Sequence, residues 1–279
     1  MFILATVFTF AIFGIPVLGL DPHATSSAQY EPPSAAHPFG TDVNGRDAFA
    51  RVLEGARISL IVGFSGAIIA LFVGTAYGLT SGYVGGRTDA LMMRFVEILY
   101  AIPRLIIIIL VTFVFDRHFK TWLNDVGLPG LVGYSKIIIL IVSLGLIEWL
   151  TMARIVRGQV LALKSQQFVL AARALGQSHT RIVLRHLLPN LIGIVIIYLT
   201  LTIPAVILDE SFLSFLGLGV QAPQASWGSL LSEGAQVINP VKSYWWLLLF
   251  PALVMSLTLL ALNFLGDALR DALDPRARR

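Results

Sequence analysis

Long apolar stretches constrain what this chain can fold into more than any other feature of its sequence. A helix needs about 20 predominantly apolar residues to cross the hydrocarbon core of a bilayer. Six stretches approach or exceed that length, the fourth being short: Phe2–Leu20, Ile58–Ser81, Leu91–Phe115, Ile137–Met152, Leu191–Phe215 and Trp245–Leu265. We therefore predict an all-α polytopic membrane protein with about six transmembrane helices.

Composition excludes the main soluble alternatives. Of the 279 residues, 56% are hydrophobic and 13% are charged, whereas about a quarter of the residues in a soluble domain are charged. The chain has no cysteine, which rules out disulfides, thiolate catalysis and cysteine-based metal sites. The histidines are scattered, so we predict no metal site. The basic pI near 9.6 favours basic cytoplasmic loops over nucleic-acid binding, because Lys and Arg are enriched there in membrane proteins.

The connections set the expected orientation and domain organisation. With both termini in the cytoplasm, the inner side carries more Lys and Arg than the outer side, as the positive-inside bias requires.

We expect a single transmembrane domain, residues 1–279, in four parts. These are a first span at 1–20, an external (periplasmic) loop with an amphipathic elbow at 21–57, a five-helix core at 58–275 that includes a cytoplasmic loop at 154–189, and a cytoplasmic tail at 276–279.

The elbow is predicted from a change of pattern after a proline-rich stretch. Apolar side chains recur at helical spacing, with charged residues between them, at Phe49, Val52, Leu53 and Ala56. This pattern indicates an amphipathic helix before the second span. The helix either lies on the membrane surface or packs against the chain's own helices.

The cytoplasmic loop at 154–189 is too polar to enter lipid but has a helical period. Its apolar positions are Phe168, Ala171, Ala172 and Leu175. Gly176 then permits positive φ and so closes that helix, and a second short helix follows. Pro189 suits the first turn of the next span, where its missing N–H is not needed. Such a helix–glycine–helix unit either docks against a partner or packs on its own bundle.

Several motifs carry a family resemblance. In the loop, the pattern is Ala171-Ala172-x3-Gly176 followed by Leu188-Pro189. Others are His37–Asp42 with Gly45–Asp47, Met152–Gln159, Glu210–Gly219, Ser226–Gly228 and Gly266–Pro275. Together they resemble the binding-protein-dependent ABC importer permeases, and in particular the C-type subunit of the oligopeptide/dipeptide branch. The loop resembles the EAA loop of that family, although Leu170 stands where the family usually has Glu.

The resemblance implies a type I ABC importer permease in a bacterial cytoplasmic membrane. It implies a homologous B-type permease, two cytoplasmic ATPases and an external peptide-binding protein as partners. The chain itself would carry no catalytic residue and no cofactor, and ATP and Mg would be bound by the ATPases; no Gly-x4-Gly-Lys-Ser/Thr loop is present. The residues implied in coupling to the ATPases are Ala171, Ala172, Arg173, Gly176, Gln177, Ser178, Arg181 and Pro189.

Charged residues within spans are costly and suggest function. We predict that Arg104, Glu148 and Glu210 contribute to a translocation path; the alternative is pairing between helices. For Arg104 the hypothesis is that it faces the path or an acidic partner in the sister subunit. Oligopeptides are the expected substrate, with dipeptides, glutathione or nickel as alternatives. An ion-coupled secondary transporter and an intramembrane hydrolase are the competing classes, but we find no internal repeat and no catalytic constellation for them.

Overall fold

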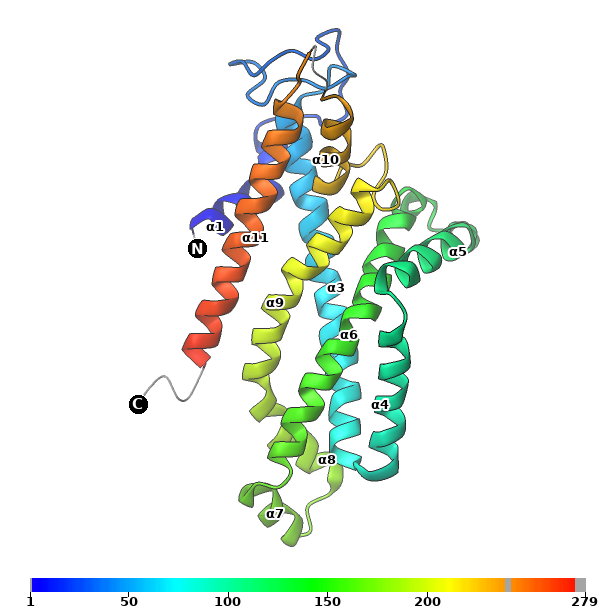
Figure 1. Cartoon of the computed structure of the whole chain (residues 1–279), viewed down its shortest axis with the longest axis vertical. Coiled ribbons are helices and arrows are strands. Elements are labelled where there is room, and N and C mark those ends of the chain that lie inside the picture. The colour runs from blue at the N-terminus through cyan, green and yellow to red at the C-terminus, as the bar shows by residue number, and fades with distance from the viewer. Residues whose placement is uncertain (1, 239–241, 274–279) are drawn as a thin grey trace.

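The computed structural model describes residues 2–238 and 242–273, and the predicted tail at 276–279 lies outside these. The regular structure of the described residues is helical, which confirms the all-α class. The long helices run side by side in an elongated bundle (Figure 1). They are α1 (Phe2–Thr9), a π-helical turn (Phe10–Gly14), α2 (Ile15–Val17), α3 (Ala48–Val84), α4 (Gly86–Ala101), α5 (Arg104–Asp125), a 3₁₀ turn (Pro129–Tyr134), α6 (Ser135–Leu163), α7 (Gln167–Ala174), α8 (His179–Ile182), a π-helical turn (Val183–Leu187), α9 (Leu188–Phe215), α10 (Trp227–Gln236) and α11 (Trp246–Leu273).

The two ends of the bundle differ in what covers them. The irregular segment 18–47 and α10 lie at one end, and α7 and α8 lie at the other (Figure 1). We call these the outer end and the inner end. The predicted loop at 154–189 is shorter than expected, because α6 continues to Leu163 before the chain turns into α7.

Four helical segments are long and apolar enough to cross a bilayer. They are Ala48–Val84, Pro129–Leu163, His179–Phe215 and Trp246–Ala272. A fifth span results if α4 and α5 are taken together, and the N-terminal apolar helix, Ile3–Val17, is shorter. The last three predicted spans lie within α6, α9 and α11 apart from Trp245, and the helices extend beyond them, α6 by eleven residues past Met152. That the N-terminal helix is the sixth span remains a prediction.

The predicted span Leu91–Phe115 is wrong as a single straight helix. Instead α4 ends at Ala101, α5 begins at Arg104, and their axes differ by 85°. The cause is Pro103, which has no N–H to continue the helix. A residue before proline is also pushed out of the helical region, and Ile102 is extended, with φ −89° and ψ 130°.

The amphipathic elbow is not a separate helix on the membrane surface. Asp47 caps α3, its side chain accepting a hydrogen bond from Ala50 N at 2.9 Å, and the helix then continues for 37 residues. Val52 and Ala56 are buried, so the alternative of packing within the chain is the one that the structure shows. The boundary expected at residue 57 therefore falls inside a helix, because nothing between Ala48 and Val84 breaks it.

The centre of the bundle is a close contact between α3 and α6. Small residues recur every fourth position on one face of α3: Gly66, Ala70, Gly74, Gly78 and Gly82. A Cβ added at Gly74 would lie 2.6 Å from Met152 Cβ and 2.7 Å from the carbonyl oxygen of Trp149. Small residues at this spacing let membrane helices approach closely. This face therefore sets the distance between α3 and α6, and the other helices pack around the pair.

Candidate functional site

The turn between α7 and α8 has the geometry predicted at Gly176. This glycine has φ +72°, and the amides of Gly176 and Gln177 donate to the carbonyl oxygens of Arg173 and Ala172 at 2.9 and 3.1 Å. This pair of hydrogen bonds is the Schellman motif that ends many helices. Ser178 then caps α8, its hydroxyl accepting from Arg181 N at 3.4 Å. The backbone of the turn is thus held by its own hydrogen bonds.

The apolar side chains of α7 divide between two sides. Val169 and Ala172 are buried, and they pack in one cluster with Ile182. Phe168 and Leu175 remain 42% and 80% exposed, and Ala171 is also exposed. Ala172, which the resemblance implies in coupling, is buried against its own bundle in this structure. One face of the unit packs on the bundle, as one of the two alternatives expected, and the other face is left open.

The polar residues implied in coupling have different roles in the structure. Arg173 and Arg181 are exposed. Gln177 points back into the unit, where its Oε1 lies 3.0 Å from His186 Nε2. Pro189 is in the first turn of α9, which confirms its predicted position. Gln177 therefore braces the unit, and the two arginines are available to a partner.

A contact that the sequence analysis did not find ties this unit to the bundle. The hydroxyl of Tyr83, near the inner end of α3, lies 2.8 Å from His179 Nδ1 in α8. The guanidinium of Arg173 lies 5.4 Å from the centre of the Tyr83 ring. No local pattern signals this contact, because residues 83 and 179 are far apart in the chain.

The second candidate site is an ion cluster that joins three helices. Arg104, the first residue of α5, lies between two carboxylates. Its Nη1 is 3.4 Å from Glu148 Oε1 in α6, and its Nη2 is 3.0 Å from Asp209 Oδ1 in α9. Arg104 is the most exposed residue of the cluster, with 56% of its side chain accessible to solvent. A cavity of about 210 Å³ adjoins it, lined also by Tyr100, Glu148 and Thr151.

Glu210 does not belong to this cluster, although it follows Asp209 directly. It is fully buried, and three hydroxyls donate to its carboxylate: Ser59 and Ser211 at 2.9 and 3.3 Å on one oxygen, and Ser214 at 2.6 Å on the other. Ser59 also accepts a hydrogen bond from Trp227 N at 3.2 Å. In this structure Glu210 therefore faces no open space and ties α3, α9 and α10 together.

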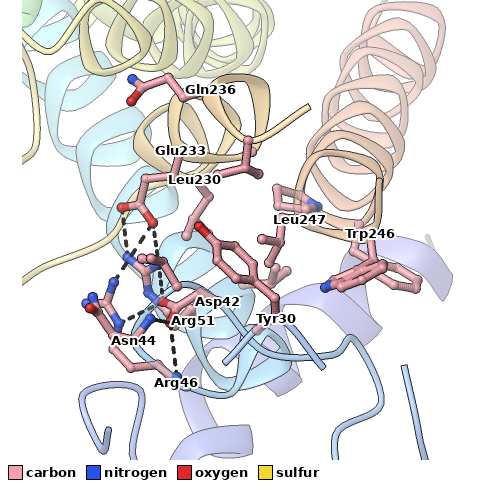
Figure 2. Close-up of a pocket in the computed structure, with 17 residues that line it drawn as sticks. Tyr30, Asp42, Asn44, Arg46, Arg51, Leu230, Glu233, Gln236, Trp246 and Leu247 are labelled. Carbon is pink, nitrogen blue, oxygen red and sulfur yellow. Dashed lines mark hydrogen bonds and ion pairs between the residues drawn. The ribbon is translucent and has the colours of Figure 1, made fainter. Parts of the chain in front are cut away.

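At the outer end, a second group of charges anchors the 18–47 segment. Figure 2 shows Arg51 between Asp42 and Glu233. Arg51 Nη1 donates to Asp42 Oδ2 at 2.9 Å, and its Nη2 donates to Glu233 Oε1 at 3.0 Å. Arg46 Nε donates to the same Asp42 oxygen at 2.7 Å. These residues border a cavity of about 310 Å³ with Tyr30 and Trp246, so the segment is attached to α3, α10 and α11.

The bundle is that of an integral membrane protein with several apolar helices. The family model described as "Binding-protein-dependent transport system inner membrane component" matches residues 74–279. That is most of the chain, and the chain belongs to this family. It is accordingly a multi-pass inner-membrane permease.

Similar proteins carry peptide-transport names. The chain is 46% identical to the dipeptide transport system permease protein DppC of Bacillus subtilis, over 100% of this chain and 81% of the relative. It is 48% identical to the oligopeptide transport system permease protein OppC of Haemophilus influenzae, over 87% and 71%. It is also 48% identical to OppC of Escherichia coli K12, over 88% and 74%.

A solved structure shares the fold. A chain of the MetNI methionine ABC transporter, in an inward-facing conformation, superposes with a TM-score of 0.58 over 81% of this chain and 95% of that one. The two sequences are 20% identical, so this likeness concerns the fold alone. The fold is that of an ABC importer permease, as predicted.

Proposed function

We propose that this chain is the C-type, path-forming subunit of an ATP-driven importer that moves oligopeptides into a bacterial cell. The observation that carries the proposal is the inner-end unit. Its backbone is fixed by the turn at Gly176, and one face packs on the bundle. The other face leaves Phe168 and Leu175 exposed beside the cations of Arg173 and Arg181. Such a rigid, partly apolar projection suits a cleft in a partner protein.

The partners follow from this role. A homologous B-type permease completes the path, two cytoplasmic ATPases bind at the inner end, and an external binding protein delivers the peptide. ATP and Mg are held by the ATPases. Both termini then lie in the cytoplasm, since α7 and α8 must face it. Closure of the ATPases on ATP pushes the inner-end unit, and the cluster of α3, α6 and α9 to which Val169 and Ala172 belong moves with it.

Oligopeptides are preferred over dipeptides, glutathione or nickel. In its support, two relatives that are 48% identical to this chain are named for oligopeptide transport, whereas a relative named for dipeptide transport is 46% identical. Uptake of labelled peptides of two to five residues, in cells that depend on this chain, separates these substrates. Preference for the longer peptides supports the proposal, and uptake of the two-residue peptide alone contradicts it.

Within the chain, Arg104 and Glu148 are proposed to line the path. They border an open cavity and bring charge to a region where charge is costly. The fully buried Glu210 is left out of this proposal. The neighbouring Asp209 takes its place as the third member of the group.

The test of docking is purification of the complex from detergent-solubilised membranes, with identification of the co-purifying chains by mass spectrometry. The variant is Leu175→Glu, which puts a charge on the open face of the inner-end unit. The control is Val84→Glu, because Val84 is also apolar and 58% exposed at the inner end but lies on α3. We expect the wild type and the control to retain two ATPases and a second permease. Leu175→Glu should lose most of the ATPases and keep the permease.

Two outcomes contradict the proposal. Recovery of the wild type alone, in a folded state, would exclude the assembly. Equal loss of the ATPases from Leu175→Glu and Val84→Glu would show that the inner-end unit is not the docking surface.

A further inference from the structure

The cluster of Arg104, Glu148 and Asp209 carries two carboxylates and one guanidinium. We propose that it receives the ammonium group of the transported peptide, which supplies a second positive charge as the peptide passes. The inference rests on the proposed function and adds to it the chemical group that this part of the path recognises.

The arrangement leaves one carboxylate oxygen without a partner. Asp209 is only 6% exposed, and its Oδ1 faces Arg104. Among residues 2–238 and 242–273, its Oδ2 has no hydrogen-bond donor. A buried carboxylate oxygen without a donor is costly, and in a membrane helix it indicates a functional site. The described chain therefore leaves the hydrogen-bonding capacity of this oxygen unused.

Neighbouring cations within the described chain do not neutralise the cluster. Glu148 and Asp209 form ion pairs there with Arg104 only. The other nearby cation, Arg154, instead stacks on the Tyr100 ring, with its guanidinium carbon 3.8 Å from the ring centre. The cluster thus holds two carboxyl groups against one guanidinium, and their low exposure strengthens the attraction for a further cation.

The cavity beside the cluster suits a primary ammonium. Its volume is about 210 Å³, and it brings Tyr100, Thr151, Arg104 and Glu148 to one space. The hydroxyls of Tyr100 and Thr151 lie 2.6 Å apart. An ammonium group has three donors and no acceptor, so carboxylate and hydroxyl oxygens are the partners it requires.

Because the chain has no cysteine, a single cysteine can report on the charge of the cavity. We would introduce Thr151→Cys in the assembled complex and measure labelling by a cationic and an anionic methanethiosulfonate. We expect faster reaction with the cationic reagent. Adding Asp209→Asn or Glu148→Gln should lower the cation-to-anion rate ratio by about tenfold. The control Asp125→Asn, about 30 Å away along α5, should leave it unchanged.

The ligand itself is tested by protection. Trialanine, at concentrations on the order of millimolar, should slow labelling of Thr151→Cys, whereas N-acetyl-trialanine should not. This measurement needs no binding protein, so the specificity of the binding protein does not enter it. In transport assays with saturated binding protein, Asp209→Asn should slow trialanine uptake about tenfold.

The contrary results are distinct. A cysteine that does not react in the complex, equal protection by both peptides, or a rate ratio insensitive to both substitutions overturns the ammonium site. A lowered ratio with unchanged uptake also overturns it, because the charge would then be structural. If the wild type imports no peptide at all, the proposed function fails, while the labelling ratio still reports the charge of the cluster.

Discussion

The guanidinium of Arg157 in α6 holds the carboxylate of Asp89 in α4 through two hydrogen bonds, of 2.5 and 2.6 Å. The hydroxyl of Ser81 in α3 donates to the same carboxylate at 2.5 Å. Lys164, where α6 ends, donates to the carbonyl oxygen of Gly82 at 2.8 Å. Three helices are thus joined at the inner end, close to the start of α7.

Asp89→Asn should destabilise the inner end by about 1–3 kcal/mol, between the values for exposed and buried ion pairs. The amide cannot accept both guanidinium hydrogen bonds, and Arg157 loses its ion-pair partner. The measurement is the melting temperature of the purified protein in detergent. Exchange of the two charges, Asp89→Arg with Arg157→Asp, should recover part of the loss. Strictly additive effects of the two single changes would show that the pair contributes no coupling.

Gly74→Leu should prevent α3 and α6 from packing. The added side chain would enter space occupied by Met152 and by the Trp149 carbonyl, and forced overpacking costs about 1–3 kcal/mol or more. We expect little folded protein in size-exclusion chromatography. Gly158→Leu is the matched control, since no atom lies within 4 Å of a Cβ at that position of α6. Equal yields of the two variants would contradict the close-contact role of Gly74.

Glu210→Leu should reduce folded protein without changing which peptides compete for uptake by the remaining complex. The substitution leaves the hydroxyls of Ser59, Ser211 and Ser214 without their common acceptor, and each unsatisfied buried group costs about 1–3 kcal/mol. Glu210→Gln keeps a carbonyl acceptor and should be milder. Yield and peptide competition are measured together. A change in peptide preference at normal yield would restore Glu210 to the path.

Glu233→Gln should loosen the 18–47 segment at the outer end. The buried Arg51 then keeps Asp42 as its charged partner, and Arg46 competes for the same carboxylate. Limited trypsin digestion is the readout, with faster cleavage after Arg46 expected. Glu31→Gln, an exposed position of the same segment, serves as the control. Unchanged cleavage in Glu233→Gln would mean that the ion pair is not what attaches the segment.

Local features of the structure could be predicted at positions where the backbone geometry favours one residue type. Gly176 closes the end of α7 because positive φ suits glycine, and Pro189 lies in the first turn of α9 because a missing N–H is tolerated there. The bend at Pro103 follows from the same rules, but the apolar run around it suggested a continuous span. Apolar length reports burial in lipid and does not report a change of direction.

Contacts between distant residues could not be predicted. The face that Ala172 presents to the bundle depends on where α8 lies, and Glu210 and Asp209, although adjacent in α9, point to different surroundings. A helical period identifies the residues on one face but not what that face meets. The pairing of Asp209 with Arg104, rather than Glu210, is decided by the rotation of α9 against α5 and α6.

By itself, the sequence determined the membrane class, the helical segments and the family, because apolar length, turn residues and ordered motifs are local properties of the chain. The tertiary structure alone decided which charges meet and which side chains remain open. Arg104, Glu148 and Asp209 become one site only through the packing of α5, α6 and α9, since residues separated by 44 and 61 positions are brought together by the fold and by no local rule.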